Sequence, residues 1–160
     1  MASRLSGPLT AYRIADRRHP ILDGAGSLIV AGRWHSIGRR VIYASTSFAV
    51  ALLEKLVHSN TGKVPKTHVA VEIQLPAGVA IERITGEDIP GWDRADCIAS
   101  RAQGDRWFDE RRSLALLVPS VVARPEENLL LNQEHPDFRL VTHGEPRPVI
   151  WDERLFVNRA

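Results

Sequence analysis

Large aliphatic residues occupy every second position of residues 67–75: Val69, Val71, Ile73 and Leu75. This period of two predicts a β-strand with one face buried in the core. Residues 76–78, Pro-Ala-Gly, then predict a turn, and residues 79–84 predict a further strand. Shorter apolar runs predict the remaining strands at residues 28–34, 41–44, 113–118, 128–132 and 149–157.

Residues 35–40 would join the strands at 28–34 and 41–44. Gly38 lies in this connection and can adopt the positive φ that a tight turn requires. Pairing of the two strands would bring Arg33 close to Tyr43.

Apolar residues spaced three or four apart predict a helix over residues 46–58, with Ser45 as its N-cap. Its apolar stripe comprises Ala49, Leu52, Leu53, Leu56 and Val57. Glu54 lies about 130° from the centre of this stripe, so we expect it to stay outside the main core. A second helix is predicted over residues 96–111.

The order of these elements predicts an α+β fold. Strands and helices do not alternate regularly, which favours mixed, mostly antiparallel sheets with flanking helices over a doubly wound parallel sheet. The 160 residues are 44% hydrophobic and contain no repeat or long linker. We therefore expect residues 1–160 to form a single domain with one main core.

Cysteine usage and hydropathy predict a cytoplasmic location. Cys97 is the only cysteine, so no internal disulfide or thiolate cluster can form. No segment approaches the roughly 18 apolar residues of a membrane span, and the first residues lack the apolar run of a signal peptide. We expect no association with a membrane.

The net charge of +2 is too small to indicate nucleic-acid binding by itself. The basic residues are nevertheless clustered, since Arg33, Arg39 and Arg40 lie within one short stretch that also holds His35. That stretch could meet phosphate groups. Residues 106–112 instead alternate in sign, which is typical of a solvated helix face.

Four polar side chains are candidates for chemistry, and each also has an ordinary structural interpretation. Arg33 could bind phosphate or carboxylate in a bidentate manner, or could stack on neighbouring Trp34. Tyr43 could stack on a ligand ring or close the core. Glu54 could act as a catalytic carboxylate or lie on the polar face of its helix, and Ser120 could bind a ligand or end a strand.

Several common classes of enzyme lack their sequence signals. Ser120 is not part of a Gly-x-Ser-x-Gly elbow, so it does not indicate a serine hydrolase. The six histidines form neither a His-x-x-x-His pair nor a His-Glu-x-x-His motif, and we expect no metal. No glycine-rich phosphate loop is present, which weighs against a dehydrogenase of the usual kind or a P-loop enzyme.

Taken in order, the motifs of this chain resemble the RES-domain family, which is named for its arginine, glutamate and serine. The resemblance spans the chain from Tyr12 to Leu155. The matching segments are Ala31-Gly32-Arg33-Trp34, Val41-Ile42-Tyr43-Ala44-Ser45, Ala51-Leu52-Leu53-Glu54, Gly104-Asp105-Arg106-Trp107, Leu117-Val118-Pro119-Ser120, Asn128-Leu129-Leu130-Leu131-Asn132, His135-Pro136 and Asp152-Glu153-Arg154-Leu155.

The resemblance implies a fold similar to the diphtheria-toxin type of ADP-ribosyltransferase, with NAD as substrate. Arg33, Tyr43 and Glu54 would be the catalytic residues, and Ser120 and Asn132 would join Arg33 and Tyr43 in binding NAD. The family's usual double glycine before Arg-Trp is Ala31-Gly32 here, and its usual Asn-Pro is Asn132-Gln133. These departures leave the loop geometry and the roles of Asn132 and His135 open.

The chemistry of the residue types agrees with this implication. Cleavage of the nicotinamide glycosidic bond develops positive charge on the ribose, which the Glu54 carboxylate would stabilise. Arg33 would hold the pyrophosphate or orient the ribose, and Tyr43 would stack on the cationic nicotinamide ring. Ser120 would be a positioning hydroxyl and not a nucleophile. The acceptor of ADP-ribose could be water, phosphate or a protein side chain.

Members of the family are mostly toxins of toxin–antitoxin pairs, so the resemblance also implies an Xre-like antitoxin that covers the active site. The toxin itself need not contact nucleic acid. Two alternatives remain open from the residues alone. One is a ribonuclease-type toxin in which the basic stretch binds RNA and His35 or His58 transfers protons. The other is a non-catalytic module that binds a protein through exposed tryptophans.

Overall fold

The computed structural model describes residues 1–59 and 62–156, whose strands form one mixed sheet. The strands follow the spatial order β1-β5-β6-β7-β3-β2-β4-β8, and β9 also pairs with β4. Only β5 and β6 run parallel among these pairs. Their bounds are β1 Ser3–Arg4, β2 Leu9–Asp16, β3 Val41–Ser45, β4 His68–Leu75, β5 Ala80–Arg83, β6 Ala115–Pro119, β7 Glu127–Asn132, β8 Thr142–His143 and β9 Arg147–Pro148.

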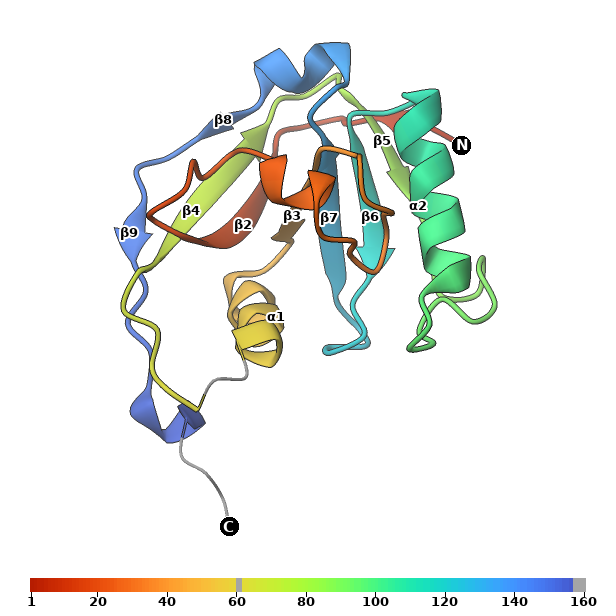
Figure 1. The fold of residues 1–160 in the computed structure, drawn as a ribbon. Coiled ribbons are helices and arrows are strands. Elements are labelled where there is room, and N and C mark those ends of the chain that lie inside the picture. Colours follow the sequence, from red (N-terminus) through yellow and green to blue (C-terminus); the bar gives the residue numbers. More distant parts are fainter. Residues whose placement is uncertain (60–61, 157–160) are drawn as a thin grey trace.

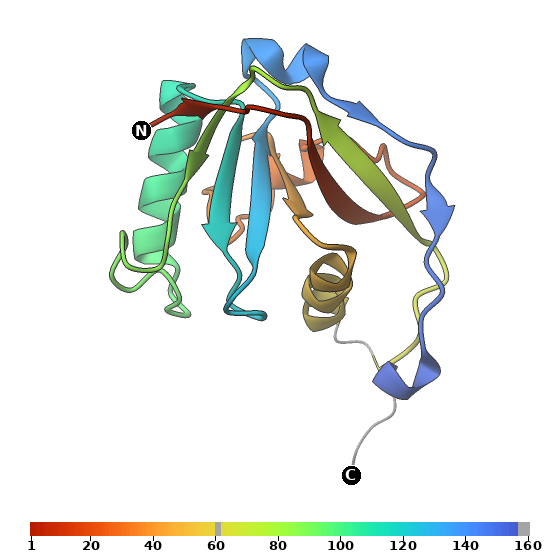
Figure 2. The same ribbon diagram turned by 180° about the vertical axis from the view of Figure 1, so that it is seen from behind.

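Within residues 1–59 and 62–156, two α-helices flank this sheet, which confirms the predicted α+β class. Helix α1 (Phe48–Ser59) lies beyond the end of β3, near the turn between β6 and β7 (Figure 1). Helix α2 (Ile98–Glu110) and the segment 25–40 cover the same face of the sheet, as the opposite view shows (Figure 2). The described part of the chain also contains three short 3₁₀ helices, η1 (Ala25–Leu28), η2 (Pro136–Leu140) and η3 (Glu153–Phe156).

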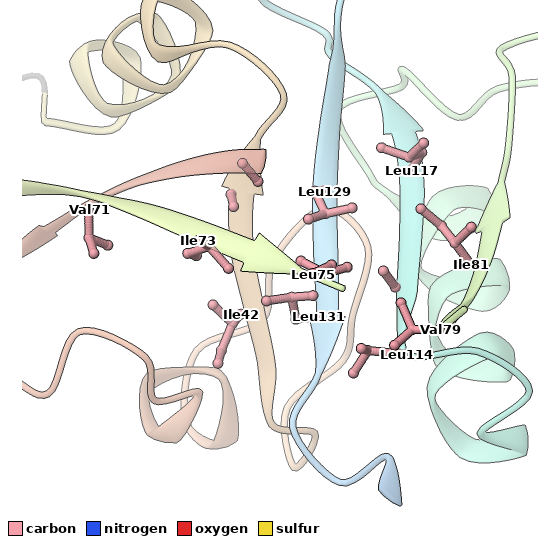
Figure 3. Close-up of a cluster of buried hydrophobic side chains, with 13 residues drawn as sticks. Ile42, Val71, Ile73, Leu75, Val79, Ile81, Leu114, Leu117, Leu129 and Leu131 are labelled. Carbon is pink, nitrogen blue, oxygen red and sulfur yellow. The ribbon is translucent and has the colours of Figure 1, made fainter. Parts of the chain in front are cut away.

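The alternation of side chains along β3 divides them between two cores. Ile42 and Ala44 join the larger core, where β2 and β4 curl over the other strands (Figure 3). Val41 and Tyr43 point to the opposite face and pack with the aromatic core under α2. The buried members of that second core are Trp34, Val41, Ile84, Trp92, Trp107, Phe108, Leu116, Val118 and Leu130.

Most predicted strands are confirmed, with boundaries that differ by one or two residues. The strand predicted at 28–34 is wrong, because this segment leaves η1 as an irregular loop on the surface, with Ile29 and Val30 exposed. The strand predicted at 149–157 is also wrong as far as residue 156, since β9 ends at Pro148 and η3 follows; residue 157 lies outside the described part. Strand β2 was not predicted, because both of its faces are partly buried and the period of two is lost.

Helix α1 is confirmed, but its orientation differs from the expectation. Ser47, not Ser45, caps the helix, because its Oγ accepts a hydrogen bond from Val50 N at 3.1 Å. The buried residues of α1 are Val50 and Ala51, whereas Leu53 and Val57 keep exposed fractions of 38% and 53%. The predicted apolar stripe therefore does not supply the buried contact. The helix instead turns the face that carries Glu54 toward the ends of β6 and β7.

Helix α2 approaches the loop before β3 so closely that one position has to be glycine. A Cβ added to Gly104 would lie 1.7 Å from the carbonyl oxygen of Trp34 and 2.7 Å from its carbonyl carbon. This contact sets how α2 packs on the segment that carries Arg33.

Candidate active site

Two distant parts of the chain converge on the carboxylate of Glu54. Ser120, which follows β6, donates from Oγ to Glu54 Oε1 at 2.7 Å. Asn128 on β7 donates from Nδ2 to the same oxygen at 2.6 Å. Within residues 1–59 and 62–156, no hydrogen bond or ion pair engages Glu54 Oε2. The carboxylate is therefore held by one oxygen, and its other oxygen can contact a substrate.

Both donors are themselves fixed by further hydrogen bonds. Ser45 at the end of β3 donates from Oγ to Asn128 Oδ1 at 2.6 Å. The backbone N–H of Ala123 donates to Ser120 Oγ at 3.0 Å, so the hydroxyl hydrogen of Ser120 is free to point at Glu54. Ser45 and Ser120 are buried. The network thus joins two strands, a turn and α1 around one carboxylate.

The strand register explains why these residues meet. Ser45 lies opposite Asn128 in the β3–β7 pair, and Asn128 lies opposite Val118 in the β6–β7 pair. Residues that face each other across strands point to the same side of a sheet, so all three share the face that bears Tyr43. Helix α1 starts three residues after β3 ends, which brings Glu54 back over that strand end.

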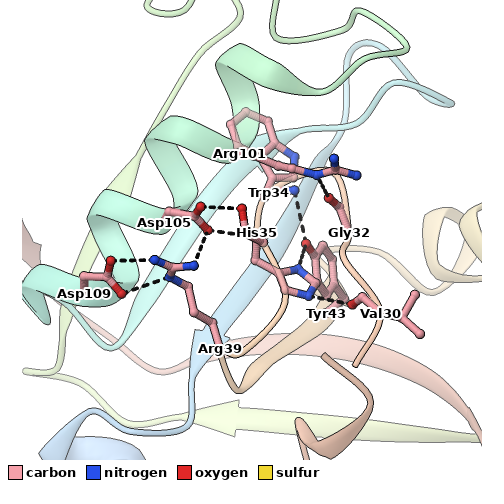
Figure 4. A network of polar contacts seen from close by, with 10 residues as sticks. Val30, Gly32, Trp34, His35, Arg39, Tyr43, Arg101, Asp105 and Asp109 are labelled. Carbon is pink, nitrogen blue, oxygen red and sulfur yellow. Dashed lines mark hydrogen bonds and ion pairs between the residues drawn. The ribbon is translucent and has the colours of Figure 1, made fainter. Parts of the chain in front are cut away.

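The hydroxyl of Tyr43 fixes the loop before β3 (Figure 4). It accepts a hydrogen bond from Trp34 N at 3.2 Å and lies 2.7 Å from His35 Nδ1. His35 Nε2 lies 3.1 Å from the carbonyl oxygen of Val30, which can only accept, so Nε2 carries the hydrogen and Nδ1 accepts from Tyr43. Burial raises the pKa of Tyr43 and lowers the pKa of His35, so both side chains are neutral.

This environment predicts that acid weakens the fold through His35. Its pKa is lowered in the folded protein, so the unfolded chain binds the proton more readily, and stability falls as pH decreases below about 6.5. Urea unfolding at several pH values should show a smaller acid-induced loss of stability for His35→Asn than for wild type. The same substitution at exposed His19 is the control and should leave the loss unchanged. Equal pH dependence of wild type and His35→Asn would contradict the prediction.

Arg33 lies in the same loop, and its side chain reaches the segment that precedes α2. Its Nη1 donates to the carbonyl oxygens of Trp92 and Arg94 at 3.1 and 2.9 Å. The structural alternative predicted that Arg33 stacks on Trp34. Trp34 instead stacks on Trp92, with ring centroids 6.2 Å apart. Among the described residues, Nε and Nη2 of Arg33 make no hydrogen bond, so they can donate to an anionic ligand.

Helix α2 holds this loop from its other side. Arg101 Nε donates to the carbonyl oxygen of Gly32 at 2.7 Å (Figure 4). Asp105 also accepts from Ser36 N at 2.8 Å. Arg33 and Tyr43 therefore belong to one fixed group, and Glu54 and Ser120 to another. The two groups are connected through β3, where Tyr43 and Ser45 point to the same face.

Asn132 and His135 lie apart from the Glu54 cluster. Asn132 is at the other end of β7, fully buried, and donates from Nδ2 to the carbonyl oxygen of Phe108 at 3.0 Å. Its Oδ1 accepts from Glu134 N, and His135 Nδ1 accepts from Asp137 N at the start of η2. These contacts give both residues structural roles. Binding of NAD by Asn132 stays a prediction that its contacts do not support.

Two of the three arginines of the basic stretch are already neutralised within the protein. Arg39 forms ion pairs with Asp105 and Asp109, at 3.4 and 2.7 Å, and Arg40 pairs with Asp23 at 3.2 Å. His35 is only 2% exposed. RNA phosphates would have to compete with these carboxylates, which weakens the ribonuclease alternative. The predicted solvated face at residues 106–112 also makes a tertiary contact, because Asp109 forms an ion pair with Arg39.

The alternative of a binding module with exposed tryptophans is wrong in its structural premise. Trp34, Trp92, Trp107 and Trp151 have exposed fractions between 0% and 8%. In the part of the chain that the structure describes, no group of histidine, cysteine, aspartate or glutamate side chains is arranged to hold a metal ion. Nor does that part contain a helix long and apolar enough to span a membrane.

The structure brings together Glu54 and Ser120, two of the candidates that the sequence offered. From the sequence, Asn128 had no predicted role of its own and Ser45 had only that of a helix N-cap. Both lie in segments that match RES-family motifs, where they look like ordinary strand residues. Only the strand register could have indicated their role. Ser45 lies opposite Asn128 in the β3–β7 pair, and two polar residues that face each other at a strand end can share a hydrogen-bond partner.

The sequence pattern of the RES domain family matches residues 10–152. The chain is 38% identical over 138 residues to a Sphingobium sp. protein named Prs ADP-ribosylating toxin, covering 84% of this chain and 86% of that protein. It is 39% identical over 117 residues to a protein named Toxin Res from Pseudomonas putida, covering 72% and 79%. It is 32% identical over 149 residues to a Toxin Res from Yersinia enterocolitica, covering 90% and 97%.

A solved structure has the same fold. The crystal structure of the M. tuberculosis MbcT–MbcA toxin–antitoxin complex contains a chain that superposes with a TM-score of 0.74 at 15% sequence identity. The match covers 96% of this chain and 89% of that chain.

Proposed function

Because the chain belongs to the RES-domain family, we propose that it is the toxin of a toxin–antitoxin pair and cleaves the bond between nicotinamide and ribose in NAD. The observation that carries this proposal is the Glu54 carboxylate, held through Oε1 by Ser120 and Asn128 and unbound at Oε2 among the described residues. An oriented carboxylate with one open oxygen is what stabilisation of a developing ribose cation requires.

The reaction needs one carboxylate and no general acid. As the glycosidic bond lengthens, positive charge moves from the nicotinamide nitrogen to the ribose, and nicotinamide leaves as a neutral molecule. Glu54 would stabilise the ribose through its negative charge and through hydrogen bonds from the ribose hydroxyls. A preorganised carboxylate is effective because it does not need to reorient during the reaction.

The other residues would bind and orient NAD. Arg33 keeps two guanidinium nitrogens without partners among the described residues, and these could donate to the pyrophosphate. Tyr43 fixes the loop through its hydroxyl, and its ring would lie against the nicotinamide. Ser120 would act through Glu54, because its hydroxyl is committed to Oε1 at 2.7 Å. None of these roles requires a metal ion.

We favour a protein side chain as the acceptor of ADP-ribose. The support is the name of the Sphingobium relative, Prs ADP-ribosylating toxin, at 38% identity over 84% of this chain. The experiment that tests the function follows NAD incubated with purified protein, with and without phosphate and with a cell lysate. Nicotinamide release establishes the reaction, and label on a protein, on phosphate or on neither identifies transferase, phosphorylase or glycohydrolase activity. Intact NAD in every condition would refute the proposed function.

Ser120→Ala is expected to lower kcat by about 10-fold, because it removes one of two hydrogen bonds to the catalytic carboxylate. The rate of nicotinamide release measures this. Ser47→Ala is the matched control, since it removes the cap of the same helix and costs about 1 kcal/mol of stability without touching Glu54. The prediction fails if Ser120→Ala, folded as wild type, retains full activity.

We also propose a protein antitoxin of the Xre type that covers the active site. A structurally similar chain occurs in a toxin–antitoxin complex. Addition of this antitoxin should then suppress nicotinamide release. Persistence of the activity in a stable complex of the two proteins would show that the partner leaves the site open.

A further inference from the structure

Asn128 occupies a position in the site that the motif pattern does not explain. It lies on β7 with Ser45 on one side and Glu54 on the other, at 2.6 Å from each. One step further into the sheet, the same face carries the pair Tyr43 and Leu130, which extends the aromatic core. The sheet therefore changes from apolar to polar side chains directly beneath the carboxylate.

The polarity of each contact fixes the orientation of the Asn128 amide. Ser45 donates its hydroxyl hydrogen to Asn128 Oδ1, which leaves Nδ2 directed at Glu54 Oε1. A reversed amide would place two acceptor oxygens against each other at the distance of a hydrogen bond, which is repulsive. Glu54, which can only accept, thus selects the orientation in which Asn128 donates to it, and the Ser45 hydroxyl stabilises that orientation by donating to Asn128 Oδ1.

The two donors on Oε1 also determine which oxygen of Glu54 faces the substrate. Ser120 follows β6, Asn128 lies on β7, and both donate to Oε1, so a partial rotation of the carboxylate would weaken both bonds. Hydrogen bonds to an ionised group are stronger than those between neutral groups, and burial strengthens them further. Oε2 is the oxygen left for the ribose.

We propose that Asn128 is a positioning residue for Glu54 and that Ser45 acts through Asn128, as a relay from β3 to the catalytic carboxylate. This inference rests on the proposed function for its catalytic consequence, while the relay itself is a property of the free protein. Its distinctive feature is a series of contacts: Ser45 holds the Asn128 amide in place, Asn128 holds Glu54, and we expect neither Ser45 nor Asn128 to contact the substrate.

Turnover of NAD by Asn128→Ala, Ser45→Ala and the double variant tests the relay. Asn128→Ala should lower kcat by about 10- to 100-fold with little change in KM, because the orientation of Glu54 matters more in the transition state than in substrate binding. Ser45→Ala should lower kcat less, by about 3- to 10-fold. The double variant should be no slower than Asn128→Ala alone, since residues that act in series are not additive.

Ser100→Ala is the matched control, because Ser100 is a fully buried serine on α2 that donates to the carbonyl oxygen of Cys97. It should keep wild-type kcat. Full activity in both Ser45→Ala and Asn128→Ala would overturn the relay. Multiplicative effects in the double variant would also overturn it, because they would show that Ser45 acts independently of Asn128.

A measurement without NAD separates this inference from the proposed function. In ¹⁵N NMR spectra, the side-chain amide hydrogens of Asn128 should exchange slowly in wild type and faster in Ser45→Ala and Glu54→Ala. If wild type leaves NAD intact while this pattern holds, the proposed function fails and the relay stands. Identical exchange in all three proteins would overturn the relay whatever the activity.

Discussion

Glu54→Gln is expected to lower kcat for nicotinamide release by about 100- to 1000-fold, the range found when one preorganised electrostatic group is removed from an active site. Glutamine keeps the size of the side chain and an oxygen that accepts from Ser120 and Asn128. The network and the fold should therefore survive. Only the negative charge that stabilises the ribose cation is lost, so KM should change far less than kcat.

The control for this substitution is Glu87→Gln, since Glu87 is exposed and lies outside the site. Both variants should have the wild-type circular dichroism spectrum and melting temperature. A Glu54→Gln protein with wild-type kcat would show that the carboxylate is not the catalytic group. Loss of activity together with loss of folded structure would assign Glu54 a structural role and contradict the prediction.

Gly104→Ala is expected to have the largest effect on stability, with a loss of about 3 kcal/mol or more. Two effects oppose each other at this position. Alanine favours the helix over glycine by about 1 kcal/mol. The new Cβ, however, would lie 1.7 Å from the carbonyl oxygen of Trp34, which is backbone and cannot rotate away. The steric clash costs more than the gain in helix propensity, so α2 has to move away from the loop that carries Arg33.

Thermal unfolding measures this effect, and a loss of about 3 kcal/mol corresponds to a fall of roughly 6–12 °C in Tm for a domain of this size. Gly144→Ala is the matched control, because its added Cβ meets no atom within 4 Å. It should change Tm only slightly. A Gly104→Ala protein as stable as Gly144→Ala would contradict the close packing of α2 on Trp34.

Hydrophobic periodicity was sufficient to predict elements whose conformation follows from their own sequence. The period of two over residues 67–75 gave β4, and the spacing of apolar residues gave α1. They failed where the tertiary environment overrides the pattern. Ile29 and Val30 are apolar enough to suggest a strand, yet their loop is held by His35, Arg101 and Asp105 and not by a strand partner.

The fold class, most strands, both helices and the candidates Arg33, Tyr43, Glu54 and Ser120 could be predicted from the sequence pattern alone. The tertiary structure decided which face of α1 meets the sheet. Helical periodicity gives the angles between side chains but not the direction in which the helix is docked. The small residue Ala51 is buried there and lets α1 approach, so Glu54 turns inward and the larger Leu53 stays partly exposed.

The assembly of the site was likewise a tertiary result. Glu54 meets Ser120 and Asn128 across 66 and 74 residues of chain, and Ser45 meets Asn128 across 83. Such contacts depend on which strands pair and in which register, and these are set by the packing of the whole sheet. Residue types specified what chemistry was available, and the pairing of β3, β6 and β7 decided where that chemistry could act.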